Sequence, residues 1–191
     1  MLILSRVGGK DGCLLYNGAE AEGFHIAAGT SYIYPTNFPV RQYQATMVKT
    51  SLFKNTLVSL PTGLGKTFIA AVVMYNYYRW YPCGKVVFMA PTRPLVAQQI
   101  RACHNIMNIP VGDTVEMTGN LNAQQQMTLW KEKRVFFLTP QVMVNDLRTN
   151  SCPPSLIKCL VVDEAHRAVK DYAYCQVNPS FTYTLLPQFL Q

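Results

Sequence analysis

Two glycines, a lysine and a threonine in one short loop constrain the fold more than any other feature of the chain. The general phosphate loop is G-x-x-x-x-G-K-[ST], and here a leucine stands at the first glycine position. Glycine permits the tight turn that points backbone amides at phosphate oxygens. The loop follows an apolar run at 55–60 and opens a helical pattern at 66–78, so a chance turn with two glycines is the weaker interpretation. Its sequence is Leu60-Pro61-Thr62-Gly63-Leu64-Gly65-Lys66-Thr67.

Each part of this loop has a predicted role toward a nucleotide. Lys66 is expected to reach the β- and γ-phosphates, and the Thr67 hydroxyl to hold Mg²⁺. The helix that follows presents its positive end to the same anion. The remaining nucleotide-binding residues are predicted to act through their backbone, and they are Pro61, Thr62, Gly63, Leu64 and Gly65.

A pair of carboxylates ends the last strongly apolar run, at 157–162. Asp163 is predicted to complete the Mg²⁺ shell, and Glu164 to orient or deprotonate the attacking water. His166 is predicted near the γ-phosphate. The alternative is a solvated pair at a strand end with a surface histidine, but the phosphate loop upstream favours the catalytic interpretation.

Apolar runs alternate with helical patterns along the middle of the chain. Strands are expected at 55–60, 85–90, 114–117, 134–139 and 157–162, and helices at 66–78, 95–107, 122–131 and 142–147. This alternation predicts an α/β fold in which helices sandwich a parallel sheet and the ligand lies at the carboxyl ends of the strands. Residues 1–33 are predicted to be a flexible N-terminal extension, 34–176 the ATP-binding domain, and 177–191 a divergent C-terminal tail.

Composition narrows the possible partners. A net charge of +7 suits a polyanion such as nucleic acid, although charge alone is weak evidence. Apolar runs stay short of a membrane span, so no membrane partner is expected. The six cysteines form no C-x-x-C pair, which argues against zinc and favours buried free thiols.

The two motifs together resemble those of superfamily 2 helicases, whose ATP-binding domain is RecA-like. Further segments fall in the order of that superfamily. By resemblance, Gln44 binds the adenine edge and Arg41 packs on its face. The resemblance also implies contacts to the DNA backbone by Thr92, Arg93, Thr118, Gly119 and Thr139. Plain turn residues, and for Thr139 a helix cap before proline, are the alternatives.

From about residue 34 to about 176 the chain resembles more narrowly the Fanconi anaemia group M and Hef family of DNA translocases. The segments that carry this resemblance are 34–37, 67–80 and 138–147. The family implies ATP and Mg²⁺ as cofactors, forked or branched DNA as substrate, DNA-repair proteins as partners, and a nuclear location.

The sequence also departs from that family. A Ser-Ala-Thr-type motif is not found after His166, nor is a second RecA-like domain, so a single incomplete motor domain with weak or no activity alone is expected. A missing central strand should leave unpaired backbone groups in the sheet, which the strand-like residues 181–186 are one candidate to fill. A non-catalytic nucleotide- or DNA-binding module, or a splice fragment, is the alternative. A small-molecule kinase is disfavoured because it has no use for these motifs together.

Overall fold

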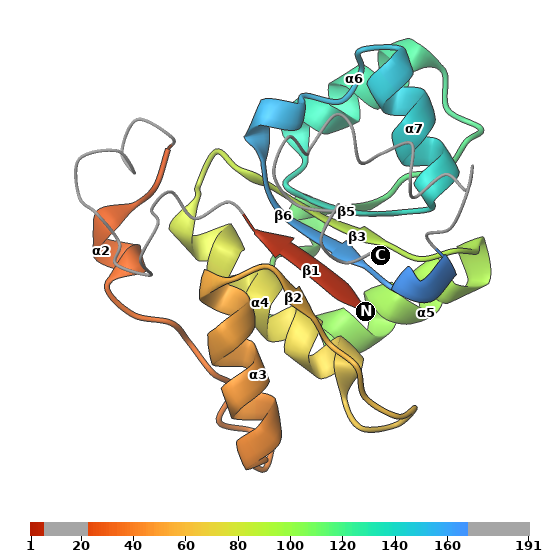
Figure 1. Cartoon of the computed structure of the whole chain (residues 1–191). Helices are drawn as coiled ribbons and strands as arrows, with labels where there is room; N and C mark the ends of the chain where they lie inside the picture. The colour runs from red at the N-terminus through yellow and green to blue at the C-terminus, as the bar shows by residue number, and fades with distance from the viewer. Residues whose placement is uncertain (6–22, 168–191) are drawn as a thin grey trace.

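A six-stranded sheet forms the centre of this computed structural model, which describes residues 1–5 and 23–167 (Figure 1). The order of the strands is β2-β1-β6-β3-β5-β4. Their bounds are Leu2–Ser5 for β1, Thr56–Leu57 for β2, Lys85–Met89 for β3, Thr114–Glu116 for β4, Val135–Leu138 for β5 and Ile157–Val162 for β6.

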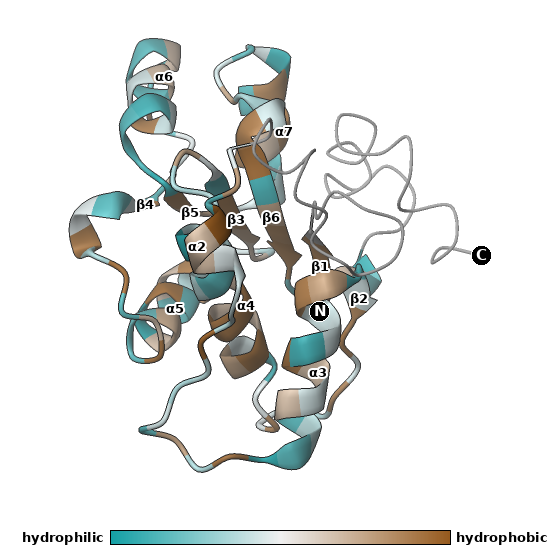
Figure 2. Cartoon of the chain, turned by 90° about the vertical axis from the view of Figure 1, so that its left-hand side faces the viewer, coloured by the Kyte–Doolittle hydropathy of each residue, from teal (hydrophilic) through white to brown (hydrophobic). Residues whose placement is uncertain are grey.

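Strands β6, β3, β5 and β4 run parallel to one another, as the alternating pattern predicts. Every residue of β3, β5 and β6 is buried. Figure 2 shows these strands as apolar ribbons between two layers of helices. Because they are covered on both faces, they read as continuous apolar runs. The predicted α/β fold class is therefore confirmed.

Helices cover the two faces of the sheet in separate groups (Figure 1). One face packs against three helices, α3 (Gln42–Phe53), α4 (Lys66–Trp80) and α5 (Arg93–His104). The other face packs against α6 (Ala123–Glu132) and α7 (Pro140–Arg148). Short helical segments lie at Ile26–Gly29 (α2), Val111–Asp113, Pro154–Leu156 and Ala165–Arg167.

Local signals set several helix ends. Asn122 accepts from the Gln125 amide and the Gln125 side chain accepts from the Asn122 amide, so α6 begins with a capping box. At the other end of α6, Lys85 Nζ donates to the carbonyls of Lys131 at 3.2 Å and Lys133 at 2.5 Å. A cation at a helix carboxyl end is favoured by the unsatisfied carbonyls there.

Strand β1 differs from the flexible extension expected for residues 1–33. Leu2–Ser5 pairs antiparallel with β6 on one side and with β2 on the other. Ile3 is fully buried, and Phe24 is buried against Trp80 and Tyr81. These pairings also depart from an all-parallel sheet. β1 lies inside the sheet, between β2 and β6, whereas the candidate segment 181–186 lies outside the described residues.

The residue that follows β2 is tied to the residue that precedes β1 as well. The Val58 amide donates to the Met1 carbonyl at 2.8 Å, and the Met1 nitrogen donates to the Val58 carbonyl at 3.1 Å. Among the described residues, β2 is joined to the rest of the sheet through β1 alone. Strand β1 therefore fixes the strand that leads into the phosphate loop.

Among the residues that the structure describes, no helix combines the length and apolarity that a membrane crossing needs.

Candidate nucleotide and nucleic-acid site

The phosphate loop joins β2 to the first turn of α4, as its motif predicts. Gly63 and Gly65 have φ values of 85° and 88°, a left-handed backbone that favours glycine. Gly65 is the N-cap of α4. Lys66 Nζ donates to the Leu60 carbonyl at 2.8 Å, so the lysine lies along the loop. The loop thus presents the helix N-terminus and a lysine to one space.

The predicted adenine-recognition residues are tied to this loop. Gln44 is buried at the start of α3, and its Nε2 donates to the Leu64 carbonyl at 3.2 Å. The Tyr43 hydroxyl donates to the same carbonyl at 3.1 Å and accepts from Arg41 Nη1 at 3.3 Å. Tyr43 lies between the two predicted residues, but no role was predicted for it. The three side chains hold the loop against the beginning of α3.

Close packing explains why Gly65 is glycine. A Cβ atom built there would lie 2.2 Å from Gln44 Nε2, well inside van der Waals contact. The same position has positive φ, which any other L-residue adopts with strain. The loop and Gln44 therefore approach each other because this residue has no side chain.

The acidic motif lies where β6 ends. Asp163 is buried, and its amide donates to the Met89 carbonyl of β3 at 2.9 Å. Burial is the largest of the effects that raise the pKa of Asp163, while the hydrogen bond from the Glu164 amide to Oδ1, at 3.0 Å, opposes it. A nearby cation stabilises the charge of a desolvated carboxylate more than that of a solvated one. A carboxylate in this environment is therefore suited to bind a metal ion.

One side chain joins the two motifs. The Thr67 hydroxyl donates to Gln99 Oε1 at 2.9 Å, and Gln99 Nε2 donates to Asp163 Oδ2 at 3.4 Å. Gln99 lies on α5 and was not among the predicted site residues, because a lone helical glutamine carries no spacing signal. The phosphate loop and the acidic motif therefore flank a single amide.

The remaining acidic-motif residues are more exposed. Glu164 has φ 50°, and its Oε2 lies 3.3 Å from His166 Nδ1. The His166 side chain is 71% exposed. The structure thus places His166 beside Glu164, and its role near the γ-phosphate stays a prediction.

The oxygen donors suit magnesium better than a softer metal. Thr67 and Asp163 offer a hydroxyl and a carboxylate, and Mg²⁺ usually takes one or two such protein ligands together with phosphates and waters. The described residues contain no group of three or more histidine, cysteine or acidic side chains able to hold a metal alone. The oxygen atoms of Thr67 and Asp163 therefore fit Mg²⁺ as ligands.

The predicted DNA contacts gather beyond the ends of the parallel strands. Thr92 is the N-cap of α5 and Thr139 the N-cap of α7, and neither side chain bonds its helix within the described chain. Arg93 Nη2 donates to Asn120 Oδ1 at 3.3 Å and lies close to Gly119. Helix N-termini and free hydroxyls are typical partners of nucleic-acid phosphates.

Thr118 belongs to the same region. Its carbonyl accepts from the Leu121 amide at 3.5 Å, in the turn that follows β4. The Arg93 bond brings this turn to the first residue of α5. Two segments that are separate in sequence thus form one surface, and their contacts with DNA stay predictions.

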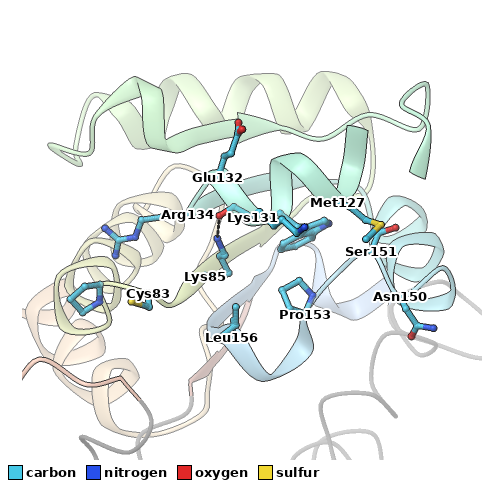
Figure 3. Close-up of a pocket in the computed structure, with 12 residues that line it drawn as sticks. Cys83, Lys85, Met127, Lys131, Glu132, Arg134, Asn150, Ser151, Pro153 and Leu156 are labelled. Atoms are coloured by element: carbon cyan, nitrogen blue, oxygen red, sulfur yellow. Dashed lines mark hydrogen bonds between the residues drawn. The ribbon is translucent and has the colours of Figure 1, made fainter. Parts of the chain in front are cut away.

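A separate cavity lies at the opposite ends of the parallel strands (Figure 3). Its volume is about 590 Å³, and it includes Lys85 at the start of β3 and Trp130 of α6. Arg134 also lines it and donates to the Tyr78 and Tyr81 carbonyls at 2.6 and 3.0 Å. Buried Lys85 and partly buried Arg134 therefore cap the carboxyl ends of α6 and α4.

Comparison with known proteins agrees with this geometry. The family described as "Type III restriction enzyme, res subunit" matches residues 37–189. The Fanconi anemia group M protein homolog of Mus musculus is 59% identical over 175 residues, which are 87% of this chain and 9% of the mouse protein. The ATP-dependent DNA helicase fml1 of Schizosaccharomyces pombe is 49% identical over 151 residues, 79% of this chain and 18% of that protein. The chain thus spans a small part of these relatives.

Solved structures give the same result for the fold. The Hef helicase domain of Pyrococcus furiosus matches with a TM-score of 0.69 and 34% identity, over 74% of this chain and 30% of that one. The UvsW helicase of bacteriophage T4 matches with a TM-score of 0.60 and 19% identity, over 82% of this chain and 54% of that one, which supports the fold alone. The predicted resemblance is confirmed, and the chain belongs to the helicase family of the type III restriction enzyme res subunit, in its Fanconi anaemia group M and Hef branch.

Proposed function

We propose that this chain is the ATP-binding domain of an ATP-dependent DNA helicase or translocase that acts on forked or branched DNA in DNA repair. One observation carries the proposal: Thr67 and Asp163 both bond Gln99, so the phosphate loop and the acidic motif face one space. A magnesium–triphosphate needs both. The names of relatives such as the fission-yeast helicase support the DNA substrate.

Within this site the chain's own residues have distinct roles. Lys66 binds the β- and γ-phosphates, while Thr67 and Asp163 hold Mg²⁺, which screens phosphate charge when bound. Glu164 orients the attacking water. Gln44, already bonded to the Leu64 carbonyl, binds the adenine edge with its remaining groups. A nuclear location and DNA-repair partners belong to the same proposal and rest on the family resemblance alone.

Nucleotide binding is the first test. A fluorescent ATP analogue is titrated into the wild-type protein and the Lys66→Ala variant, with excess Mg²⁺. Lys49→Ala, an exposed lysine of α3, is the control for charge. We expect Lys66→Ala to weaken binding by at least tenfold and Lys49→Ala to leave it unchanged. Equal affinities for all three proteins would contradict the proposed site.

A non-catalytic binding module remains the second candidate. Both candidates bind the nucleotide, so a hydrolysis assay with forked DNA separates them. Even weak stimulation of phosphate release by forked DNA, lost in Glu164→Gln, supports the motor domain, because a single incomplete motor domain is expected to hydrolyse ATP slowly. Nucleotide binding without any DNA-stimulated release supports the binding module.

A further inference from the structure

Gln99 contacts the nucleotide site from α5, the helix whose N-terminus lies at the predicted nucleic-acid surface. It lies in α5, partly buried, and it accepts from Thr67 and donates to Asp163. Neither bond involves the backbone of α5, so helix formation alone does not require a glutamine here. The neighbouring Gln98 is exposed and makes no such contact within the described chain.

The direction of each bond suits a metal site. A threonine hydroxyl has one hydrogen and two lone pairs. Because the hydrogen goes to Gln99 Oε1, the lone pairs of Thr67 are left for a cation. Gln99 Nε2 holds Asp163 Oδ2, while the Glu164 amide holds Oδ1, so both carboxylate oxygens are oriented. The amide is neutral and therefore adds no charge that competes with the cation.

The same helix begins at the nucleic-acid surface. Thr92 is the N-cap of α5 and Arg93 is its first residue. Gln99 follows Thr92 by seven residues, which is about 10 Å along a helix. A rigid shift of α5 toward a bound strand therefore moves Gln99 relative to Thr67 and Asp163, which lie on α4 and at the end of β6.

We propose that Gln99 is a positioning residue that orients Thr67 and Asp163 for Mg²⁺ and couples this metal site to the nucleic-acid surface through α5. The inference rests on the proposed function. Partners that orient metal ligands typically change metal affinity by about 10–100-fold when they are removed. Coupling through α5 is reciprocal, so bound DNA changes Mg²⁺–nucleotide affinity, and bound nucleotide changes DNA affinity by the same factor.

The test measures the affinity of a fluorescent ATP analogue with saturating Mg²⁺ and with EDTA. In Gln99→Met, which keeps the length and loses both bonds, we expect the gain in affinity from Mg²⁺ to fall by about tenfold. Affinity in EDTA should match the wild type, because the phosphate loop is intact. Gln98→Met, one residue away, is the matched control and should behave as wild type.

A second variant checks that the effect of Gln99→Met does not come from misfolding. Gln99→Asn keeps the polar amide but is one methylene too short to reach both partners, and the same loss is expected. Urea unfolding confirms that each variant is folded. A further arm adds single-stranded DNA: the change in Mg²⁺–nucleotide affinity seen in wild type should disappear in Gln99→Met and Gln99→Asn.

The outcomes separate the two proposals. If the wild-type protein fails to bind the nucleotide, the proposed function fails. If the wild type binds and both Gln99 variants keep the full Mg²⁺ dependence and the full DNA effect, the proposed function stands and the role of Gln99 is overturned. A loss of affinity that is equal in EDTA and in Mg²⁺ also overturns it, because that pattern reports a general packing defect.

Discussion

Trp130 Nε1 donates a hydrogen bond to Asp146 Oδ2 at 2.7 Å, and both side chains are buried between α6 and α7. Asp146 Oδ1 has no hydrogen-bond partner among the described residues. A buried carboxylate with a single donor depends strongly on that donor, because the charge has few other sources of stabilisation. This pair joins the two helices that cover one face of the sheet.

Removing the donor should therefore destabilise the protein. We expect Trp130→Phe to lower the free energy of unfolding by about 1–3 kcal/mol through the lost hydrogen bond, in addition to lost packing. In the Asp146→Asn background the same substitution should cost less, because no charge is left behind. Urea unfolding of the four proteins in this cycle measures the coupling, and additive effects would contradict it.

The pH dependence of stability should report the same carboxyl group. Burial raises the pKa of Asp146, so the folded state binds its proton more tightly than the unfolded state does. Its contribution to stability is therefore most favourable below the ordinary aspartate range and is lost as pH rises through the raised value. The stability of wild type relative to Asp146→Asn should improve from neutral to mildly acidic pH. Parallel pH profiles of the two proteins in urea unfolding would contradict this.

A side chain at Gly65 should lower stability, chiefly through strain at its positive φ. Alanine there adds strain at φ 88° and forces its Cβ into Gln44 Nε2, so the bond between Gln44 and the Leu64 carbonyl is lost. We expect Gly65→Ala to cost about 1–3 kcal/mol of stability and to weaken nucleotide binding at least tenfold. Gly112→Ala is the control, since no described neighbour lies within 4 Å of its Cβ. Thermal unfolding and nucleotide titration measure both effects.

Arg93 and Arg101 offer a matched pair for DNA binding, since both lie on α5 and differ in place along it. Arg93 is at the end with the predicted phosphate contacts, whereas Arg101 bonds its own helix at the Ala97 carbonyl. We expect Arg93→Ala to weaken binding of forked DNA several-fold. The slope of the logarithm of the binding constant against the logarithm of the salt concentration should also fall, by the amount expected for about one phosphate contact. Arg101→Ala should do less, as fluorescence anisotropy at several salt concentrations will show. Equal losses would mean that only net charge matters.

Strand β1 should contribute to both stability and function. We expect Ile3→Ala, at a fully buried position, to cost about 2–5 kcal/mol. It should also weaken nucleotide binding, because β2 is held through β1. Leu57→Ala on the neighbouring strand is the control, since Leu57 is half exposed. Chemical denaturation and nucleotide titration of the two variants provide the comparison. If Ile3→Ala changed neither the free energy of unfolding nor nucleotide affinity, the proposed contribution of β1 would be wrong.

The sequence predicted the parallel part of the sheet because its strands are buried on both faces and bounded by turn residues. Lys85–Met89 and Ile157–Val162 lie within or on the expected ranges. The phosphate loop was predictable for a similar reason, since its chemistry depends on consecutive residues. Elements whose identity rests on distant partners were not predicted. Leu2–Ser5 is too short for a period, and its place as a strand comes from pairing with β2 and β6.

Site residues divide in the same way. Residues with a predicted role were named in advance, whereas Gln99 was not, because its contacts cross between elements. Tyr43 lies between the predicted Arg41 and Gln44, but its contact with the phosphate loop was not predicted for the same reason. His166 shows the limit of a motif. Its position in sequence was clear, but its side chain pairs with Glu164 and is largely exposed. The domain limits at 33 and 176, and the roles of the individual site residues, stay predictions.

The pairing of Leu2 with Val162 joins residues from nearly opposite ends of the described chain. Closing so long a loop is entropically costly, and non-local pairings of this kind slow folding. The parallel strands β3, β5 and β6 can assemble with their helices before β1 docks. A refolding experiment should therefore show an early phase in which these strands form and a later one in which the nucleotide-binding loop becomes ordered. Competence to bind the nucleotide would then be acquired last.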